Sequence, residues 1–470
     1  MENLNTLKET FKLIDEKENI CTYEHLKTYI NTYIKGLNKR ELIFILCDNS
    51  IDTIMTYIGC IENKIVPVML SGKIKDDDLE KLIRKYKPKY IWCKESRKNM
   101  LDNYSLEYAY NDYILLSRVE GYIVKLHDEL ALLLTTSGST GDGKLVRISY
   151  KNIYTNTLQI IDSLNIKSTD VTALVLPVNY TYALSIVNTY YSKGGTILVF
   201  ESPIYSGKIW RLMDKYKVTS FSGVPYTFEI IFKLRLTDYF PKSLKIITVA
   251  GGNLLIFYQE KLYEFAKKNN ADFYLMYGQT EATARISCIK AERKEHLGTI
   301  GKVLAGEKYE ISDDGELIIY GDNVSMGYAL FEEDLFKGYE NGSRLATNDI
   351  VEIDKNNNLV WKGRKDRVVK ILGNRVDLNH LEKKLKTAYK GYNFICNKSK
   401  DDITLDDTTL KVEKEKQEKI KINTNYTNPE EIREYIKRLT GFNKKIIIVN
   451  VVSEFKRKEN GKIDYCKEFS

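Results

Sequence analysis

Histidine and cysteine are scarce in this sequence and follow no catalytic or metal-binding pattern. Four of the 470 residues are histidines, and they lie far apart. We therefore do not expect a histidine-based metal site or a catalytic triad. The seven cysteines are odd in number and lack the spacing of a zinc site. We expect them to be reduced thiols in a cytoplasmic protein; they are Cys21, Cys47, Cys60, Cys93, Cys288, Cys396 and Cys466.

Long hydrophobic runs are also missing. No stretch of about 18 uninterrupted apolar residues occurs, which predicts no transmembrane helix and no membrane insertion. The N-terminal stretch MENLNTLKETFKLIDEKEN is charged and helix-like, and it has none of the apolar character of a signal peptide. At 470 residues the chain is too long for one compact core, so we expect two or three domains.

The excess of positive charge is modest, +8 from 72 basic and 64 acidic residues. Such an excess would favour anionic ligands, such as a nucleotide or an acidic carrier protein. The densest charged run, residues 411–421, contains no interleaved aromatic residues. We interpret it as a solvated edge and expect no nucleic-acid partner.

Strand-like and helix-like segments alternate along most of the chain. Residues 41–47 form an apolar run typical of a buried strand, and residues 51–62 have the pattern of a helix. Such alternation predicts an α/β fold with parallel sheets and helices on their faces. Further expected strands are 66–69, 90–93, 145–149, 171–176, 246–250, 272–276 and 446–451, and further expected helices are 77–85, 151–164, 378–389 and 430–439.

A loop rich in glycine and hydroxyl side chains follows the apolar run that ends at Leu134. It reads TTSGSTGDGK and ends at Lys144. Glycines allow backbone N–H groups to point at one anion, and hydroxyls and a lysine add further donors, so the loop predicts a phosphate site. A Walker A loop is an alternative, but Leu145 stands where that loop needs Ser or Thr, and a strand follows instead of a helix.

The order of these residues resembles the phosphate loop of the adenylate-forming superfamily, which includes acyl-CoA synthetases, peptide-synthetase adenylation domains and firefly luciferase. The chain is most similar to the acyl-CoA and acyl-carrier-protein ligases. The resemblance implies that ATP is bound by Thr136, Ser137, Gly138, Ser139, Thr140, Gly141 and Lys144.

A second motif of this superfamily is Tyr277-Gly278-Gln279-Thr280-Glu281, at the end of an expected parallel strand. Ligands bind at that edge of such sheets. Tyr277 offers an aromatic face for adenine, Thr280 a hydroxyl for a phosphate, and Glu281 a carboxylate for Mg²⁺. We assign Thr280 and Glu281 as catalytic, Glu281 also as the metal ligand, and the glycine turn Gly251-Gly252-Asn253 as part of the nucleotide site.

A third group of motifs begins near residue 347. Asp349 lies where the superfamily has an acidic residue that accepts from both ribose hydroxyls. Asn348 replaces the usual glycine there, and asparagine tolerates unusual backbone angles best among the other residues. The resemblance implies that Arg364 contacts the ribose and phosphate, that Asp366 is a hinge, and that the loop around Gly373 lines the entry channel of the thiol.

The last motif is Asn460-Gly461-Lys462, which implies that Lys462 is the catalytic lysine. The approach to it lacks the usual proline, and Tyr465 stands where arginine is common. The resemblance also implies a large domain at 1–363, built of parallel-sheet α/β subdomains plus a small β region. A small mobile α+β lid domain is expected at 364–470.

These features imply a ligase that uses ATP and Mg²⁺ to convert a small carboxylic acid to an acyl-adenylate and pyrophosphate. Acyl transfer to coenzyme A or to the phosphopantetheine of an acyl carrier protein would follow. Ala183 stands where amino-acid-activating relatives have an aspartate, which disfavours an α-amino acid. The candidate pocket residues are Tyr180, Ser222 and Gly251.

Several alternatives remain at this point. The chain could be an amino-acid-activating ligase for a carrier protein, or a degenerate nucleotide-binding module without catalysis. It could also pass the acyl group to an amine or oxidise it, and a P-loop NTPase would release phosphate instead of pyrophosphate.

Overall fold

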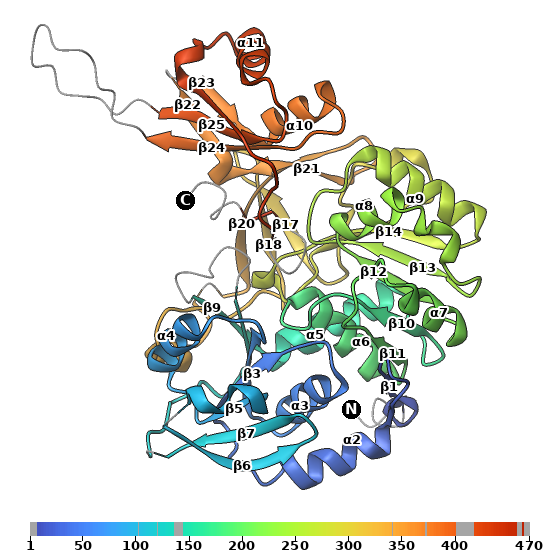
Figure 1. The fold of residues 1–470 in the computed structure, drawn as a ribbon, viewed down its shortest axis with the longest axis vertical. Helices are drawn as coiled ribbons and strands as arrows, with labels where there is room; N and C mark the ends of the chain where they lie inside the picture. Colours follow the sequence, from blue (N-terminus) through green and yellow to red (C-terminus); the bar gives the residue numbers. More distant parts are fainter. Residues whose placement is uncertain are drawn as a thin grey trace, which may run out of the picture. The chain divides into compact units, whose positions relative to one another are not determined.

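The computed structural model describes residues 7–101, 103–119, 121–135, 144–340, 342–371, 374–400, 418–457 and 463–464. The chain divides into two compact units (Figure 1). The first contains Met1–Glu310, Ile318–Leu345 and Asp354–Leu359, and the second contains Ile311–Leu317, Ala346–Ile353 and Val360–Ser470. The predicted boundary between residues 363 and 364 stays a prediction.

The first unit contains a large sheet whose central strands are parallel. Among the described residues its order is β16-β15-β14-β13-β12-β10-β11-β1-β2. The strands from β14 to β1 pair in parallel, and antiparallel strands complete both edges. The bounds are β1 Lys12–Ile14, β2 Ile20–Thr22, β10 Val171–Leu174, β11 Thr196–Val199, β12 Ser220–Gly223, β13 Ile246–Val249, β14 Asp272–Tyr277, β15 Ser287–Lys290 and β16 Lys302–Val303.

A second sheet of this unit has the order β19-β9-β8-β4-β3-β5-β7-β6 within the described chain. Strands β8, β4, β3 and β5 are parallel neighbours, whereas β9, β19, β7 and β6 pair antiparallel. The bounds are β3 Leu42–Cys47, β4 Val66–Ser71, β5 Tyr90–Lys94, β6 Tyr104–Tyr110, β7 Tyr113–Arg118, β8 Leu130–Thr135, β9 Leu145–Ser149 and β19 Gly327–Ala329.

Successive side chains of a strand point to opposite faces of its sheet, so the apolar side chains of one strand contribute to two different cores. In β3, Ile43 and Ile45 join a core shared with the large sheet, whereas Phe44 joins a core on the other face. This two-sided burial explains the unbroken apolar run of β3. A third core covers the other face of the large sheet.

Helices fill the spaces next to these cores. Helices α3, α5 and α6 contribute to the core shared by the two sheets, and α7, α8 and α9 contribute to the third core (Figure 1). The bounds are α2 Tyr23–Tyr29, α3 Ile51–Glu62, α4 Asp76–Tyr86, α5 Tyr150–Leu164, α6 Thr181–Lys193, α7 Gly207–Lys215, α8 Pro225–Lys233 and α9 Ile256–Lys268.

Shorter sheets follow toward the C-terminus. One has the order β17-β18-β20-β21, with bounds Lys308–Ile311, Glu316–Tyr320, Arg344–Ile353 and Leu359–Arg364. The hairpin β22 (Val368–Ile371) and β23 (Asn374–Asp377) comes next. In the second unit, helices α10 (Leu378–Ala388) and α11 (Pro429–Thr440) share an apolar core with β24 (Phe394–Lys400), β25 (Glu418–Thr424) and β26 (Ile447–Val451).

The helix expected at the N-terminus is wrong for the described part of that stretch. Residues Leu7–Thr10 form a short 3-10 turn, and Lys12–Ile14 form strand β1. Phe11 and Leu13 are fully buried, and β1 pairs in parallel with β11. Tertiary pairing with an existing sheet therefore decides the conformation of this charged stretch.

The strands and helices expected elsewhere are present with bounds shifted by a few residues. Among the described residues, no helix is long and apolar enough to cross a membrane. The six described cysteines are free thiols, and all but Cys288 are buried.

Candidate nucleotide and acid site

Two predicted motifs lie at the same edge of the large sheet. Tyr277 is the last residue of β14, and the turn Gly251–Asn253 follows its parallel neighbour β13. The carboxyl ends of neighbouring parallel strands form the ligand edge of such sheets. Gly251 has a φ of 82°, a left-handed conformation that favours glycine.

The turn after β14 requires glycine at position 278. A Cβ atom at Gly278 would lie 1.8 Å from the carbonyl oxygen of Ala284, which no packing adjustment can accommodate. The chain continues into a 3-10 turn, η5 (Thr280–Ala282), and Thr283 then adopts a left-handed φ of 53°. This tight path presents Thr280 and Glu281 immediately beyond the sheet edge.

Glu281 is held by a tyrosine that is not among the predicted site residues. The hydroxyl of Tyr328 in β19 donates to Glu281 Oε1 at 2.8 Å, and the backbone N–H of Ser325 donates to the Glu281 carbonyl at 2.9 Å. The ammonium of Lys144 lies 3.2 Å from the centroid of the Tyr328 ring, a cation–π contact. Tyr328 therefore links the predicted ATP-binding residue Lys144 to the predicted metal ligand Glu281, which lie far apart in the sequence.

A buried arginine fixes the strand that carries Tyr328. Arg147 is 0% exposed and donates to the carbonyls of Tyr328 and Met326, both at 3.1 Å, and to that of Lys337. It also forms an ion pair of 2.6 Å with Glu340. Such a network holds β19 against β9 and fixes the position of Tyr328.

The predicted ribose residues belong to the second unit. Asp349 is 3% exposed, and its Oδ1 accepts from Trp361 Nε1 at 2.9 Å. Its Oδ2 lies 3.6 Å from the guanidinium of Arg364. The structure thus brings Asp349 and Arg364 together, and Asn348 before them has the left-handed φ of 60° that suits asparagine.

Several residues predicted to belong to the site are not described by the structure. Thr136, Ser137, Gly138, Ser139, Thr140, Gly141, Gly373 and Lys462 lie outside the described residues. The backbone of Asp366 lies in the 3-10 turn η8 (Lys365–Arg367), between β21 and β22. The roles assigned to these residues stay predictions.

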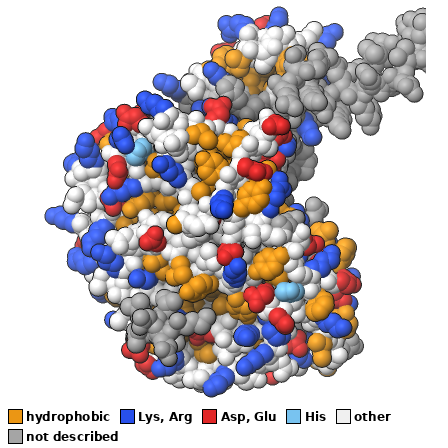
Figure 2. All heavy atoms as spheres, turned by 180° about the vertical axis from the view of Figure 1, so that it is seen from behind, with side chains coloured by type: hydrophobic (Ala, Val, Ile, Leu, Met, Phe, Trp, Pro, Cys, Tyr) orange, Lys and Arg blue, Asp and Glu red, His pale blue; other side chains and the backbone are white. Residues whose placement is uncertain are grey.

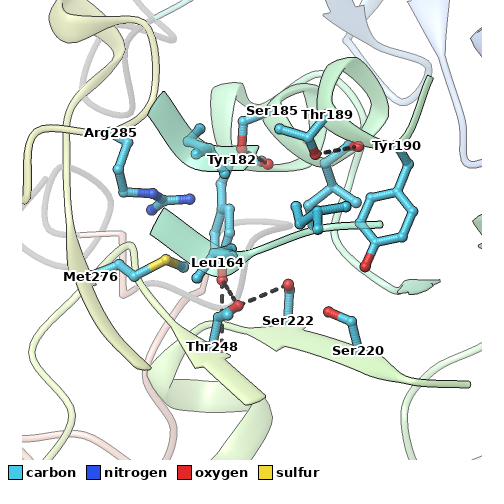
Figure 3. Close-up of a pocket in the computed structure, with 13 residues that line it drawn as sticks. Leu164, Tyr182, Ser185, Thr189, Tyr190, Ser220, Ser222, Thr248, Met276 and Arg285 are labelled. Carbon is cyan, nitrogen blue, oxygen red and sulfur yellow. Dashed lines mark hydrogen bonds between the residues drawn. The ribbon is translucent and has the colours of Figure 1, made fainter. Parts of the chain in front are cut away.

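A small cavity lies between helices α5 and α6 and strands β12, β13 and β14 (Figure 3). Its volume is about 20 Å³, room for about one water molecule. The predicted pocket residue Ser222 lines it, whereas Tyr180 precedes α6 and Gly251 follows β13, and neither lines it. The lining includes the side chains of Tyr182, Ser185, Ser222, Thr248, Met276 and Arg285.

The hydroxyls of this cavity form a chain. The Tyr182 hydroxyl and Thr248 Oγ1 are 2.7 Å apart, and Thr248 Oγ1 donates to Ser222 Oγ at 2.8 Å (Figure 3). The Ser185 hydroxyl donates to the Tyr182 carbonyl at 2.7 Å. Of the charged side chains in the described chain, only that of Arg285 lines the cavity.

Magnesium suits the donors that are present. Mg²⁺ in nucleotide sites is held by one or two carboxylates together with phosphate oxygens and water. Glu281 supplies one positioned carboxylate, and the described residues contain no cluster of three or more His, Cys, Asp or Glu side chains that could hold a metal alone. The arrangement fits a metal that arrives with ATP.

The residues that could bind a nucleotide are therefore spread over one sheet edge and the strands that follow it. The chain matches the family described as AMP-binding enzyme over residues 5–329. It belongs to this family. The predictions of the superfamily, of its α/β fold and of an acid-adenylating enzyme are thereby confirmed.

Similar proteins include ligases and synthases. The 2-succinylbenzoate–CoA ligase of Staphylococcus epidermidis is 26% identical over 360 residues, which cover 74% of this chain and 73% of that protein. Bacitracin synthase 2 of Bacillus licheniformis is also 26% identical, over 75% of this chain and 14% of that protein.

Solved structures share the fold. The ATP-bound RpMatB-BxBclM chimera B1 has a TM-score of 0.79 at 18% identity, with 99% of this chain and 98% of that chain covered. The o-succinylbenzoate CoA synthetase MenE of Bacillus subtilis, in complex with its acyl-adenylate intermediate, has a TM-score of 0.74 at 18% identity. In that comparison 99% of this chain and 97% of that chain are covered.

Basic side chains are mixed with acidic ones on the face drawn in Figure 2. The modest positive charge of the chain therefore does not form a single basic patch on that face. This distribution of charge gives no support for the binding of one large polyanionic partner.

Proposed function

We propose that this chain activates a carboxylic acid with ATP and transfers the acyl group to the thiol of coenzyme A. In the first step, a carboxylate oxygen attacks the α-phosphorus of ATP, and the bond to the departing pyrophosphate breaks. In the second step, the thiol sulfur attacks the acyl carbon, AMP leaves, and the thiol proton passes to solvent.

The observation that carries this proposal is the anchored Glu281 at the sheet edge. Its carboxylate is oriented by Tyr328, whose ring is covered by the Lys144 ammonium. The first step brings an anionic carboxylate to an anionic phosphate, so its main requirement is the neutralisation of charge. When bound at Glu281, Mg²⁺ supplies part of that neutralisation.

Each remaining residue has a proposed role in holding the nucleotide. Tyr277 stacks on adenine, and the turn Gly251, Gly252 and Asn253 contacts the nucleotide. Thr280 donates to a phosphate, Asp349 accepts from the ribose hydroxyls, and Arg364 contacts ribose and phosphate. The phosphate loop and Lys462 act on the phosphates and the developing negative charge.

The second step requires the lid to change its position. We place the lid at residues 364–470 and the hinge at Asp366, and rotation there would withdraw Lys462 and admit the thiol. Hinges are commonly a few residues in loops or at the ends of elements, and Asp366 lies in the short turn between β21 and β22. Relatives named as CoA ligases favour coenzyme A over a carrier protein as the acceptor.

The acid is not an α-amino acid in this proposal. Ala183 is fully buried in α6 and offers no carboxylate for an ammonium group. The described lining of the cavity beside α6 also contains no acidic side chain. A plain or hydroxylated organic acid is the better fit.

The test is acid-dependent exchange of labelled pyrophosphate into ATP over a panel of carboxylic acids. We expect exchange with at least one acid and a loss of about 100-fold or more in Lys462→Ala. Lys467→Ala, a neighbouring lysine in the sequence, is the matched control. Phosphate release without pyrophosphate exchange, or full exchange by Lys462→Ala, would contradict the proposed chemistry.

A further inference from the structure

Arg285 lies inside the first unit and reaches the cavity between α5, α6 and the large sheet. The residue is 2% exposed. Its backbone is fixed from two sides, since its carbonyl accepts from the amides of Asn156 at 2.8 Å and Asn323 at 3.1 Å. Its backbone N–H donates to Asn156 Oδ1 at 3.2 Å. The main chain is thus held independently of the guanidinium.

The guanidinium has no ionic partner in the described chain. No carboxylate forms an ion pair with it, and its buried Nε makes no hydrogen bond to a described residue. Its central carbon lies over the face of the Tyr182 ring, 4.7 Å from the centroid (Figure 3). A buried charge without a partner is strongly unfavourable, so such groups are normally paired.

Proton loss does not remove this charge. Burial lowers the pKa of the Arg285 guanidinium, but an arginine begins so high that it stays protonated in proteins. Glu307 is another buried ionisable group whose side-chain oxygens have no hydrogen-bond partner among the described residues. Burial raises the pKa of Glu307 to about 9, so that group becomes neutral at pH 7. Arg285 keeps its charge.

The surroundings of Arg285 suit an anion. The cavity also presents the hydroxyls of Tyr182, Ser222 and Thr248, which can donate to oxygen atoms. Its wall includes Met276, which directly precedes the predicted adenine residue Tyr277. Arg285 itself follows Glu281 by four residues. The cavity therefore shares its walls with the segment that carries the proposed nucleotide site.

We propose that Arg285 binds a second anionic group, a carboxylate at the far end of the acid that the enzyme activates. The substrate class is then a dicarboxylic acid. This inference rests on the proposed function, because it takes the cavity as the acid pocket. The small volume of the cavity, about 20 Å³, excludes an acid that continues far beyond its second carboxylate.

The experiment compares pairs of acids that differ only in the terminal group. Succinate is paired with butyrate, glutarate with pentanoate, and terephthalate with p-toluate, so that a methyl group replaces one carboxylate. Pyrophosphate exchange and calorimetric binding are both measured, for wild type, Arg285→Met and Arg285→Lys. Exposed Arg211→Met in α7 is the matched control for the loss of an arginine.

We expect wild type to favour the dicarboxylate of at least one pair by tenfold or more in kcat/KM and in affinity. This preference falls to about one in Arg285→Met, is partly restored in Arg285→Lys, and is unchanged in Arg211→Met. Thermal unfolding of each variant shows whether it is folded. If Arg285→Met does not fold, Arg285→Lys, which retains the positive charge, is the variant to compare with wild type.

The two proposals fail in different ways. Exchange with acids but no preference for the dicarboxylate, or a preference that survives in Arg285→Met, overturns the role of Arg285 and leaves the adenylation intact. Arg285-dependent binding of a dicarboxylate without any exchange supports the anion site and overturns the proposed reaction. If no dicarboxylate binds or supports exchange, the proposed role of Arg285 is wrong.

Discussion

Two arginines are buried in the first unit, and they differ in what surrounds their charge. Arg147 donates to three backbone carbonyls and pairs with Glu340. Arg285 lies against the Tyr182 ring and hydroxyl side chains, without an ionic partner in the described residues. Burial is nearly equal at the two sites, 0% and 2% exposed.

The difference separates a structural role from a ligand-binding role. A charge whose partners all come from the chain stabilises the fold and leaves no capacity for a ligand. A permanent charge that the chain leaves unpaired retains its capacity for an anion that arrives from outside. Partners, and not the depth of burial, therefore distinguish Arg147 from Arg285.

The largest expected effect is on stability, at Arg147. Arg147→Met leaves the carbonyls of Met326, Tyr328 and Lys337 without their donor and Glu340 without its partner. We expect the free energy of unfolding to fall by about 3–5 kcal/mol in urea titration. Arg285→Met removes an unpaired charge and should unfold at the same urea concentration or a higher one. Equal losses in the two variants would contradict the comparison.

Glu307 tests whether a buried group without a partner sheds its charge. Burial raises the pKa of the Glu307 carboxyl to about 9 in the folded state. Between about pH 4.5 and pH 9 this carboxyl therefore ionises in the unfolded state but not in the folded state. The free energy of unfolding then falls as the pH rises through this range. Glu307→Gln cannot titrate. The stability of the wild type relative to Glu307→Gln should fall by about 2–3 kcal/mol between pH 6 and pH 8, measured by urea titration at both values. A constant difference would contradict the raised pKa.

Gly278 tests whether the segment between β14 and Arg285 requires its tight turn. A methyl group at Gly278 would collide with the Ala284 carbonyl and shift the segment that leads to Arg285 and follows Glu281. We expect Gly278→Ala to lower the rate of pyrophosphate exchange about 100-fold. Gly207→Ala is the control, since a methyl group there meets no atom within 4 Å. Exchange by Gly278→Ala at the wild-type rate would rule out the tight turn.

The smallest expected effect concerns the contact that Arg147 holds in place. Tyr328→Phe keeps the ring under Lys144 and removes the hydroxyl that donates to Glu281. Loss of one hydrogen bond to a carboxylate predicts about a tenfold rise in the KM for Mg-ATP, measured in the exchange assay. Tyr339→Phe, which removes a hydroxyl bonded to Ser149 instead, is the control. An unchanged KM in Tyr328→Phe would remove Tyr328 from the site.

The sequence predicts local features of this molecule better than distant contacts. Apolar runs such as β3 and the order of the Tyr277–Glu281 motif depend on neighbouring residues, and these predictions agree with the structure where it describes them. The N-terminal stretch was mispredicted as helix-like because β1 gains its stability from pairing with β11, whose residues come far later in the chain.

The functional contacts missed in the sequence share this cause. Tyr328 reaches Glu281 across 47 positions, and the ring that lies against Arg285 belongs to Tyr182 in helix α6. The local sequence around either residue does not show which distant side chain it contacts. An arginine four residues after a nucleotide motif becomes informative only when the surroundings of its guanidinium can be seen.

The most direct test of the account is mass spectrometry of the products formed from Mg-ATP and the preferred dicarboxylic acid in the absence of coenzyme A. We expect an acyl-adenylate that retains one free carboxylate, together with pyrophosphate, and a thioester with release of AMP when coenzyme A is added. ADP and phosphate as the products would contradict it.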